Sequence, residues 1–126
     1  MIGSALSRRV YAYAAPVDMR KGYDGLSAVV RESLGRDPLS GDLYLFVSRN
    51  RIRAKVLLWD GTGLCVYAKR LEQGRFACLW RRREGELLAL SQSELQLFLE
   101  GCELIGRRRL SPPPMRQENL VISRSL

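Results

Sequence analysis

Basic and apolar side chains alternate along one short segment of this sequence. The cations stand at the odd-numbered positions Arg49, Arg51, Arg53 and Lys55, and the apolar residues at the even-numbered positions Ile52, Ala54, Val56 and Leu58. A period of two places successive side chains on opposite faces of a β-strand. If the segment is extended, one face carries a row of cations and the other packs against a core. Such a row suits phosphate oxygens, so this segment is the first candidate for a binding surface.

The whole chain shares this basic character. It contains 21 lysines and arginines against 13 aspartates and glutamates, has no histidine, and carries a formal net charge of +8 at pH 7. Most of the cations are arginines, whose planar guanidinium matches phosphate oxygens in pairs and stacks on aromatic rings. A merely solvated basic surface is the alternative, and the arginine content favours contact with a nucleic acid.

Further basic clusters and one aromatic residue join the alternating segment as candidates. The candidate nucleic-acid-binding residues are Arg20, Lys21, Arg49, Arg51, Arg53, Lys55, Tyr67, Lys69, Arg70, Arg75, Arg107, Arg108 and Arg109. We expect Arg53 and Lys55 to share a sheet face with Tyr67 and Lys69, because cations interleaved with aromatic rings bind a nucleic-acid backbone and stack on bases. A register that leaves this face solvated, or that places the aromatic rings in a core, fits the pattern equally well.

Residues for catalysis are scarce. Without histidine the chain lacks the commonest general base. The aspartates Asp18, Asp24, Asp37, Asp42 and Asp60 stand mostly at positions typical of helix caps and turns. Such a distribution does not predict the converging carboxylates that a two-metal nuclease needs. We therefore expect no catalytic residues and no enzyme activity, with a metal-dependent nuclease as a distant alternative.

Cysteine usage and hydropathy bear on the compartment. Cys65, Cys78 and Cys102 are widely spaced and odd in number, which predicts reduced, buried thiols that cannot easily supply four zinc ligands. No apolar run approaches the ~20 residues that span a bilayer. The segment from Met1 to Pro16 also lacks the apolar centre of a signal peptide. We expect a cytoplasmic protein with no metal, no cofactor and no membrane contact.

Period-two patterns and turn signals predict the strands. They are expected over residues 10–14, as an edge strand, and over residues 42–48, 52–59, 64–71, 75–80 and 86–90. The Asp60–Gly63 sequence is typical of a hairpin turn. Residues 42–71 are therefore expected to form three consecutive antiparallel strands.

The first predicted helix follows the first strand. Asp18 is a suitable N-cap for a helix that begins at Met19, and Gly35 supplies its end. Gly22 and Gly25 inside this helix would each cost roughly 1 kcal/mol relative to alanine. That cost suggests that another backbone approaches the helix closely.

The second predicted helix has the clearest start in the sequence. Ser91 and Glu94 form a capping box, and Gly101 marks the end of the apolar stripe that follows. Together the elements predict a single α+β domain over residues 1–106, with an antiparallel meander sheet of four to five strands and two helices on one face. Residues 107–126 are predicted to be a basic, Arg/Pro-rich tail, extended or disordered.

Several motifs, taken in order, resemble one family of proteins. They are Asp18–Gly22, Asp24–Leu26, Asp37–Gly41, Lys55, Trp59–Gly63, Lys69–Phe76 and Leu95–Gly101. They resemble the second-reading-frame (TnpB) accessory protein of IS66-type bacterial insertion sequences, which is unrelated to the RNA-guided nucleases of the same name. The resemblance covers most of the chain, from about Val10 to Gly101. Phe98 replaces a usual leucine, and Asn50 interrupts a turn that is often richer in arginine.

This resemblance implies an accessory role in transposition, beside a separate, larger transposase that carries the strand-transfer chemistry in the bacterial cytoplasm. The matching positions suited to phosphate contact are Arg20, Lys21, Lys55, Lys69, Arg70 and Arg75. We predict a non-enzymatic factor that binds DNA, at transposon ends or non-specifically, largely through phosphates and within a transposase complex. The alternative is a protein-interaction module that docks on the transposase without direct DNA contact.

Overall fold

The computed structural model describes residues 8–81 and 84–101. In chain order the elements are β1 (Val10–Pro16), α1 (Tyr23–Ala28), the π-helical turn η2 (Val29–Ser33), β2 (Leu43–Val47), β3 (Arg53–Trp59), β4 (Leu64–Arg70), β5 (Leu87–Leu90) and α2 (Gln92–Leu99). η2 continues α1, so the two form one helical segment. The α+β class is therefore confirmed.

The five strands form one mixed sheet in the order β4-β3-β2-β1-β5. The predicted antiparallel run β2-β3-β4 is confirmed, but the sheet is not a pure meander, because β1 pairs with β2 in parallel. The helical segment between these two strands carries the chain back across the sheet, as a parallel connection requires. The prediction that the first strand lies at an edge was wrong, because β1 lies between β2 and β5.

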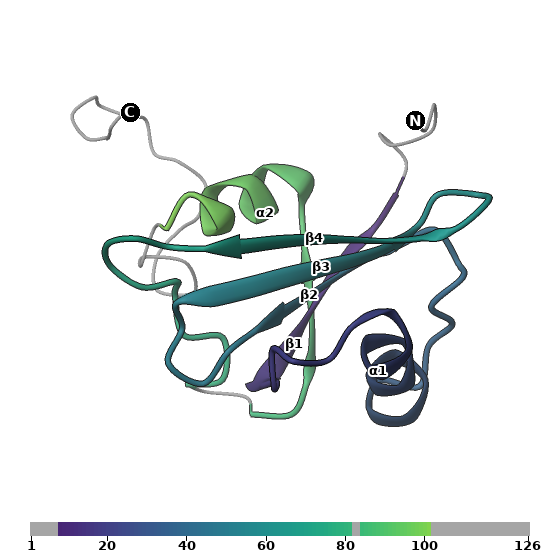
Figure 1. Ribbon diagram of the computed structural model, residues 1–126, viewed down its shortest axis with the longest axis horizontal. Helices are drawn as coiled ribbons and strands as arrows, with labels where there is room; N and C mark the ends of the chain where they lie inside the picture. Colours follow the sequence, from purple (N-terminus) through teal and green to yellow (C-terminus); the bar gives the residue numbers. More distant parts are fainter. Residues whose placement is uncertain (1–7, 82–83, 102–126) are drawn as a thin grey trace.

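Both faces of the sheet are covered, and this corrects the prediction of two helices on one face. Figure 1 shows α1 and α2 on opposite sides of the strands. The reason lies in β2, where Tyr44 and Phe46 point toward α1, while Leu45 and Val47 point toward α2. All four side chains are fully buried. A strand that is apolar at every position needs a cover on each face, so one helix packs on each side.

The first helix begins later than predicted, at Tyr23. The Asp18 carboxylate accepts hydrogen bonds from the backbone N–H and the guanidinium of Arg20, so it closes a turn and does not cap the helix. Gly22 takes the N-cap position without a side-chain hydrogen bond. At Gly25, the atoms nearest to an added Cβ would be those of the Lys21 side chain, so the closest neighbour is a side chain and not the backbone that the sequence suggested.

The second helix matches its prediction closely. The Ser91 hydroxyl accepts a hydrogen bond from the Glu94 N–H, and the Glu94 carboxylate accepts one from the Ser91 N–H. α2 ends at Leu99, and Gly101 has a φ of +91°, the left-handed conformation that suits glycine after a helix. The helix buries Phe98 against the sheet.

The segment predicted as a strand over residues 75–80 is irregular. Phe76 is fully buried and stacks on Phe98 of α2, with ring centroids 5.1 Å apart. Its N–H donates to the carbonyl of Arg51, in the turn between β2 and β3. This segment therefore fills the core beneath α2 and does not add to the sheet.

The Asp60–Gly63 turn confirms the predicted hairpin between β3 and β4. One oxygen of the Asp60 carboxylate accepts hydrogen bonds from the N–H groups of Thr62 and Gly63 and from the Thr62 hydroxyl. These bonds favour the ionised carboxylate and lower the pKa of Asp60 to about 2.

This lowered pKa predicts an acid-sensitive hairpin. The stabilisation from Asp60 should be present above its ordinary pKa of 3.8 and should be lost as the pH falls toward about 2. Urea unfolding at several pH values checks this prediction. Asp60→Asn keeps an acceptor oxygen that does not titrate, so it should show a shallower loss of stability in acid than the native chain. Equal slopes for the two proteins would contradict this role of the carboxylate.

Candidate nucleic-acid interface

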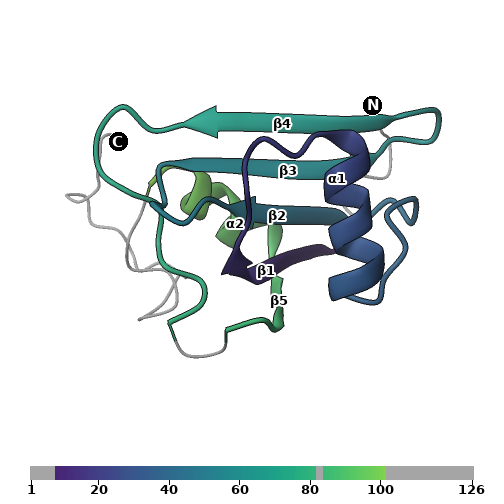
Figure 2. The same ribbon diagram turned by 60° about the horizontal axis from the view of Figure 1, so that its bottom comes forward.

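Arginines gather at one end of the sheet, where β2 and β4 end and β3 begins. We define the arginine end as Arg49, Arg53, Arg70 and Arg75. Arg49 lies in the turn between β2 and β3, Arg53 opens β3, Arg70 closes β4, and Arg75 lies in the segment that follows. All four residues are exposed. In Figure 2 these strand ends lie at the left, and α1 covers the other end of the strands.

Arg51 holds the arginine end together. Its φ of 61° is unusual for a residue with a side chain and marks a tight turn. The Arg51 carbonyl accepts a hydrogen bond of 2.7 Å from the Phe76 N–H, and its guanidinium donates one of 3.1 Å to the Phe76 carbonyl. These bonds fasten the segment that carries Arg75 to the turn that carries Arg49. Arg51 was predicted to bind nucleic acid, but its guanidinium has a structural partner.

Asn50 also builds this turn. Its side-chain oxygen accepts hydrogen bonds from the Ser48 hydroxyl and the Ile52 N–H, at 2.8 and 3.1 Å. The residue that interrupts the row of arginines therefore shapes the turn that presents Arg49.

Two arginines of this end face each other across neighbouring strands. Arg53 and Arg70 are directly paired in the β3–β4 register, which brings two like charges together at a cost to stability. Glu72 forms an exposed ion pair with Arg70 at 3.0 Å. An exposed pair of this kind is worth little, so a phosphate could replace it. Within the described ranges, the side chains of Arg49, Arg53 and Arg75 form no hydrogen bond or ion pair with another residue.

The two lysines of the predicted surface lie on opposite faces of the sheet. Lys55 pairs with Ala68, and Lys69 pairs with Ala54, so Lys55 faces α1 and Lys69 faces α2. Tyr67 shares the α2 face with Lys69. The prediction that Arg53 and Lys55 share a face with Tyr67 and Lys69 was therefore wrong. Sequence periodicity predicts which residues of one strand share a face. The register between two strands decides which residues of the neighbouring strand lie on that same face.

Both lysines donate to backbone carbonyls. The Lys55 ammonium contacts the carbonyls of Met19 and Lys21 at 2.8 and 2.9 Å and so ties the loop before α1 to β3. The Lys69 ammonium contacts the carbonyl of Leu99 at 2.7 Å. A cation at this position also suits the negative end of the dipole of α2. These two candidates therefore act first as ties within the fold.

The loop before α1 carries the remaining described candidates, Arg20 and Lys21. Both are exposed, and Arg20 pairs with Asp18 at 2.7 Å. This pair holds the pKa of the Asp18 carboxyl well below its usual range. Because Lys55 binds the loop, Arg20 and Lys21 lie on the same face of the sheet as Arg53. They extend the arginine end along the α1 face.

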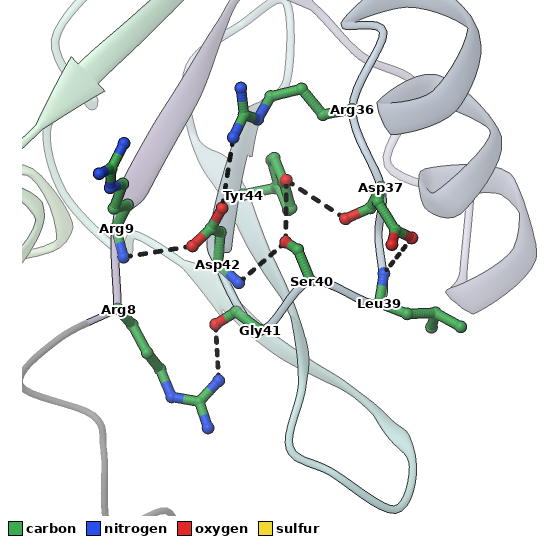
Figure 3. A network of polar contacts seen from close by, with 9 residues as sticks. All are labelled: Arg8, Arg9, Arg36, Asp37, Leu39, Ser40, Gly41, Asp42 and Tyr44. Carbon is green, nitrogen blue, oxygen red and sulfur yellow. Dashed lines mark hydrogen bonds and ion pairs between the residues drawn. The ribbon is translucent and has the colours of Figure 1, made fainter.

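A second group of arginines, which the sequence analysis did not single out, lies at the opposite end of β2. Arg8 donates to the carbonyl of Gly41 at 2.6 Å, and Arg36 contacts the carboxylate of Asp42 at 3.5 Å (Figure 3). The Arg36 guanidinium also stacks over the ring of Tyr11, 4.2 Å from its centroid. These side chains close a corner of the fold, so they are poor candidates for a free anion site. Their partners are up to 51 residues away in the chain, where Arg8 donates to the carbonyl of Trp59, so no local sequence pattern predicts them.

Ser40 and Tyr44 complete this corner. Their hydroxyl groups lie 3.3 Å apart, and the Tyr44 hydroxyl donates to the carbonyl of Asp37 at 3.4 Å. The Asp37 carboxylate accepts a bond from the Leu39 N–H. Asp37 and Ser40 of the Asp37–Gly41 motif therefore have structural roles, because their hydrogen bonds hold this corner together.

Residues 8–81 and 84–101 also bear on two other features, a metal-binding group and a membrane-spanning helix. Here Cys65 is exposed and Cys78 is half-buried, although the cysteines were predicted to be buried. This part of the chain contains no group of cysteine, aspartate and glutamate residues that could hold a metal ion. None of its helices has the length and apolar character needed to cross a bilayer. Arg107, Arg108 and Arg109, which were predicted as part of a basic tail, lie outside the described residues.

The different roles of Lys55 and Arg53 can be separated by mutation. Lys55→Met removes two charge-assisted hydrogen bonds and should lower the free energy of unfolding by about 1.5–3 kcal/mol. Arg53→Ala removes an exposed side chain without a partner in the described structure and should change the free energy of unfolding by less than about 0.5 kcal/mol. Urea denaturation measures both. A loss for Arg53→Ala as large as for Lys55→Met would contradict this division of roles.

The chain is similar to known proteins over most of its length. A family model described as "IS66 Orf2 like protein" matches residues 8–109. Two similar proteins come from Sinorhizobium fredii (strain NBRC 101917 / NGR234). "Uncharacterized protein y4hO" is 37% identical over 103 residues, which cover 82% of this chain and 88% of the relative. "Uncharacterized protein y4jC" is 33% identical over 103 residues, which cover 82% and 86%. No solved structure matches the chain.

Proposed function

Because this chain belongs to the family of IS66 Orf2-like proteins, we propose that it is a non-enzymatic accessory factor for transposition that binds DNA through the arginine end. The family suggests a role in the transposition of IS66-type elements. We propose, beyond this family role, that the chain binds DNA, that it does so at the arginine end, and that it catalyses no reaction.

The arginine end is the observation that carries this proposal. Three of its guanidinium groups, those of Arg49, Arg53 and Arg75, have no partner in the described structure, and Arg70 has a weak, exposed one. Each guanidinium presents a fork of N–H donors that matches phosphate oxygens. The like charges of Arg53 and Arg70 face each other, so a bound phosphate between them would relieve a repulsion that exists in the free protein.

The arrangement favours phosphate contacts over base contacts. Tyr67, the aromatic residue predicted to stack on bases, lies on the other face of the sheet from Arg53. Contacts to phosphates position a protein on DNA without reading its sequence. We therefore expect binding with little sequence preference, and recognition of transposon ends would come from the transposase.

The salt dependence of binding tests this proposal. Four phosphate contacts predict a slope of log Kobs against log salt concentration of about −3.6, and a loss of affinity of about 10²-fold between 50 and 200 mM salt. Fluorescence anisotropy with a short DNA duplex measures this slope. Binding that does not respond to salt, or no binding to single- or double-stranded DNA, would overturn the proposal.

Single substitutions localise the contact. Arg49→Ala, Arg53→Ala and Arg75→Ala should each weaken binding to all sequences alike and reduce the magnitude of the salt slope by about 1. Arg31→Ala is the matched control, because it removes the same charge from the exposed surface of η2. The control should leave the slope unchanged. If Arg31→Ala has the same effect as the other three, the attraction is general and the arginine end is not the site.

Direct docking on the transposase is the second candidate, and one observation favours it. A Cβ at Gly22 would meet nothing within 4 Å, so the start of α1 is open surface among the described residues. A complex with purified transposase that survives nuclease treatment, and that is lost on Gly22→Arg but kept on Arg53→Ala, would support this candidate over DNA binding. A complex that nuclease destroys would support contact through DNA.

A further inference from the structure

Among residues 8–81 and 84–101, no strand covers one long edge of the sheet. β4 is the terminal strand on its side, and its seven residues pair with β3 without a bulge, from Leu64 opposite Trp59 to Arg70 opposite Arg53. The strand contains no proline. The other edge strand, β5, has only four residues. Exposed edges are a liability that proteins shorten, bend or cover, and β4 is neither short nor bent.

The hydrogen bonds at the two ends of the β3–β4 ladder show which backbone groups face outward. The Leu71 N–H donates to the carbonyl of Ile52, and the Asp60 N–H donates to the carbonyl of Gly63. In an antiparallel ladder the bonded pairs alternate along the strand. The N–H and C=O groups of Cys65, Tyr67 and Lys69 therefore point to β3. Those of Leu64, Val66, Ala68 and Arg70 point away from the sheet.

The centre of this edge carries no charged side chain. The Lys69 ammonium is held by the carbonyl of Leu99, and Arg70 lies at the end of the strand. The middle of the strand is apolar and open, with Tyr67 53% exposed and Ala68 exposed. An edge with free backbone groups and an aromatic residue at its centre has the properties of a strand-pairing surface.

We infer that β4 pairs antiparallel with β4 of a second copy of this chain, which would join the two sheets into one continuous sheet with two-fold symmetry. In the register that pairs all seven residues, Tyr67 lies opposite Tyr67 of the second copy. Val66 and Ala68 then lie opposite each other, and both have outward-facing backbone groups. This register therefore pairs the residues of β4 whose backbone groups are not used by β3.

The charges of β4 favour a second copy as the occupant. In this register Lys69 faces Cys65 of the second copy, and Arg70 faces Leu64, so no like charges stand opposite each other. The centre brings together two tyrosines, a favourable cross-strand pair. The strand is therefore complementary to itself in charge and in apolar content.

Such a dimer has a consequence for the proposed function. Arg70 closes β4, so an antiparallel pair places the two arginine ends at opposite ends of the joined sheet. Two separate segments of DNA could then be held by one dimer. This consequence depends on the proposed DNA contact, but the dimer itself does not and is tested without DNA.

Sedimentation equilibrium of the full chain tests the inference. The expected mass at high concentration is twice the 14.3 kDa of one chain. Ala68→Pro removes an outward-facing N–H and leaves the bonds to β3 in place, so it should raise the dissociation constant of the dimer at least about 10-fold. A native chain that stays monomeric at all concentrations would overturn the inference.

The other edge supplies a matched control. Ala89 is an exposed alanine in β5, and the bond from the Ala14 N–H to the carbonyl of Glu86 shows that the Ala89 backbone faces away from β1. Ala89→Pro should leave the dimer intact. If it dissociates the dimer as strongly as Ala68→Pro does, the β4 edge is not the contact. Circular dichroism of both variants verifies that the fold is retained.

A disulfide tests the register without disturbing β4. Opposed residues in a non-hydrogen-bonded antiparallel pair have Cα atoms about 4.5 Å apart, close enough for a disulfide. Tyr67→Cys should therefore give a covalent dimer on mild oxidation. The native chain is the control, because in this register its Cys65 lies opposite Lys69 of the second copy. Equal amounts of covalent dimer in the two proteins would contradict the pairing at Tyr67.

Discussion

The burial of β2 on both faces is the constraint on which the rest of this structure depends. Tyr44 and Phe46 on one face and Leu45 and Val47 on the other are fully inaccessible to solvent, so a helix must cover each side of the sheet. A chain with a net charge of +8 must place its cations elsewhere. Among the described residues, the cations of the sheet lie at the ends of strands or donate to backbone carbonyls, and others lie in the loop before α1 and on η2. The covered faces leave no room for the cationic face that strand periodicity suggests.

The cations therefore fall into two groups with different consequences. Lys55, Lys69 and Arg51 each find carbonyl partners and tie together segments that are distant in the sequence. Arg53 and Arg70 stand opposite each other, and Glu72 forms an ion pair with Arg70 alone. An unbalanced cluster of this kind costs stability in the free protein. This imbalance supports the proposal that an anion binds there.

Local signals predicted the local structure well. The Ser91–Glu94 capping box and the Asp60–Gly63 turn are both formed as expected, because each depends on atoms a few residues apart. Most of the errors concern long-range relations: the parallel pairing of β1, the position of the helices on two faces, and the register of β4. The strand predicted over residues 75–80 was also wrong, because that segment fills the core beneath α2. The helix start was misplaced because the Asp18 carboxylate accepts hydrogen bonds from Arg20 and does not cap the helix, and because Lys55, 36 residues from Met19, ties the loop before the helix to β3. Such contacts leave no periodic trace in the sequence.

The most direct measurement of the central claim is a nuclear magnetic resonance titration of the isotope-labelled full chain with a short DNA duplex. The account predicts that the backbone signals of residues 48–53 and 70–75 shift with added DNA. It also predicts that those of the corner around Arg36 and Asp42, where the arginines are already partnered, stay unchanged. Shifts centred on that corner, or no shifts at the arginine end at low salt, would contradict it.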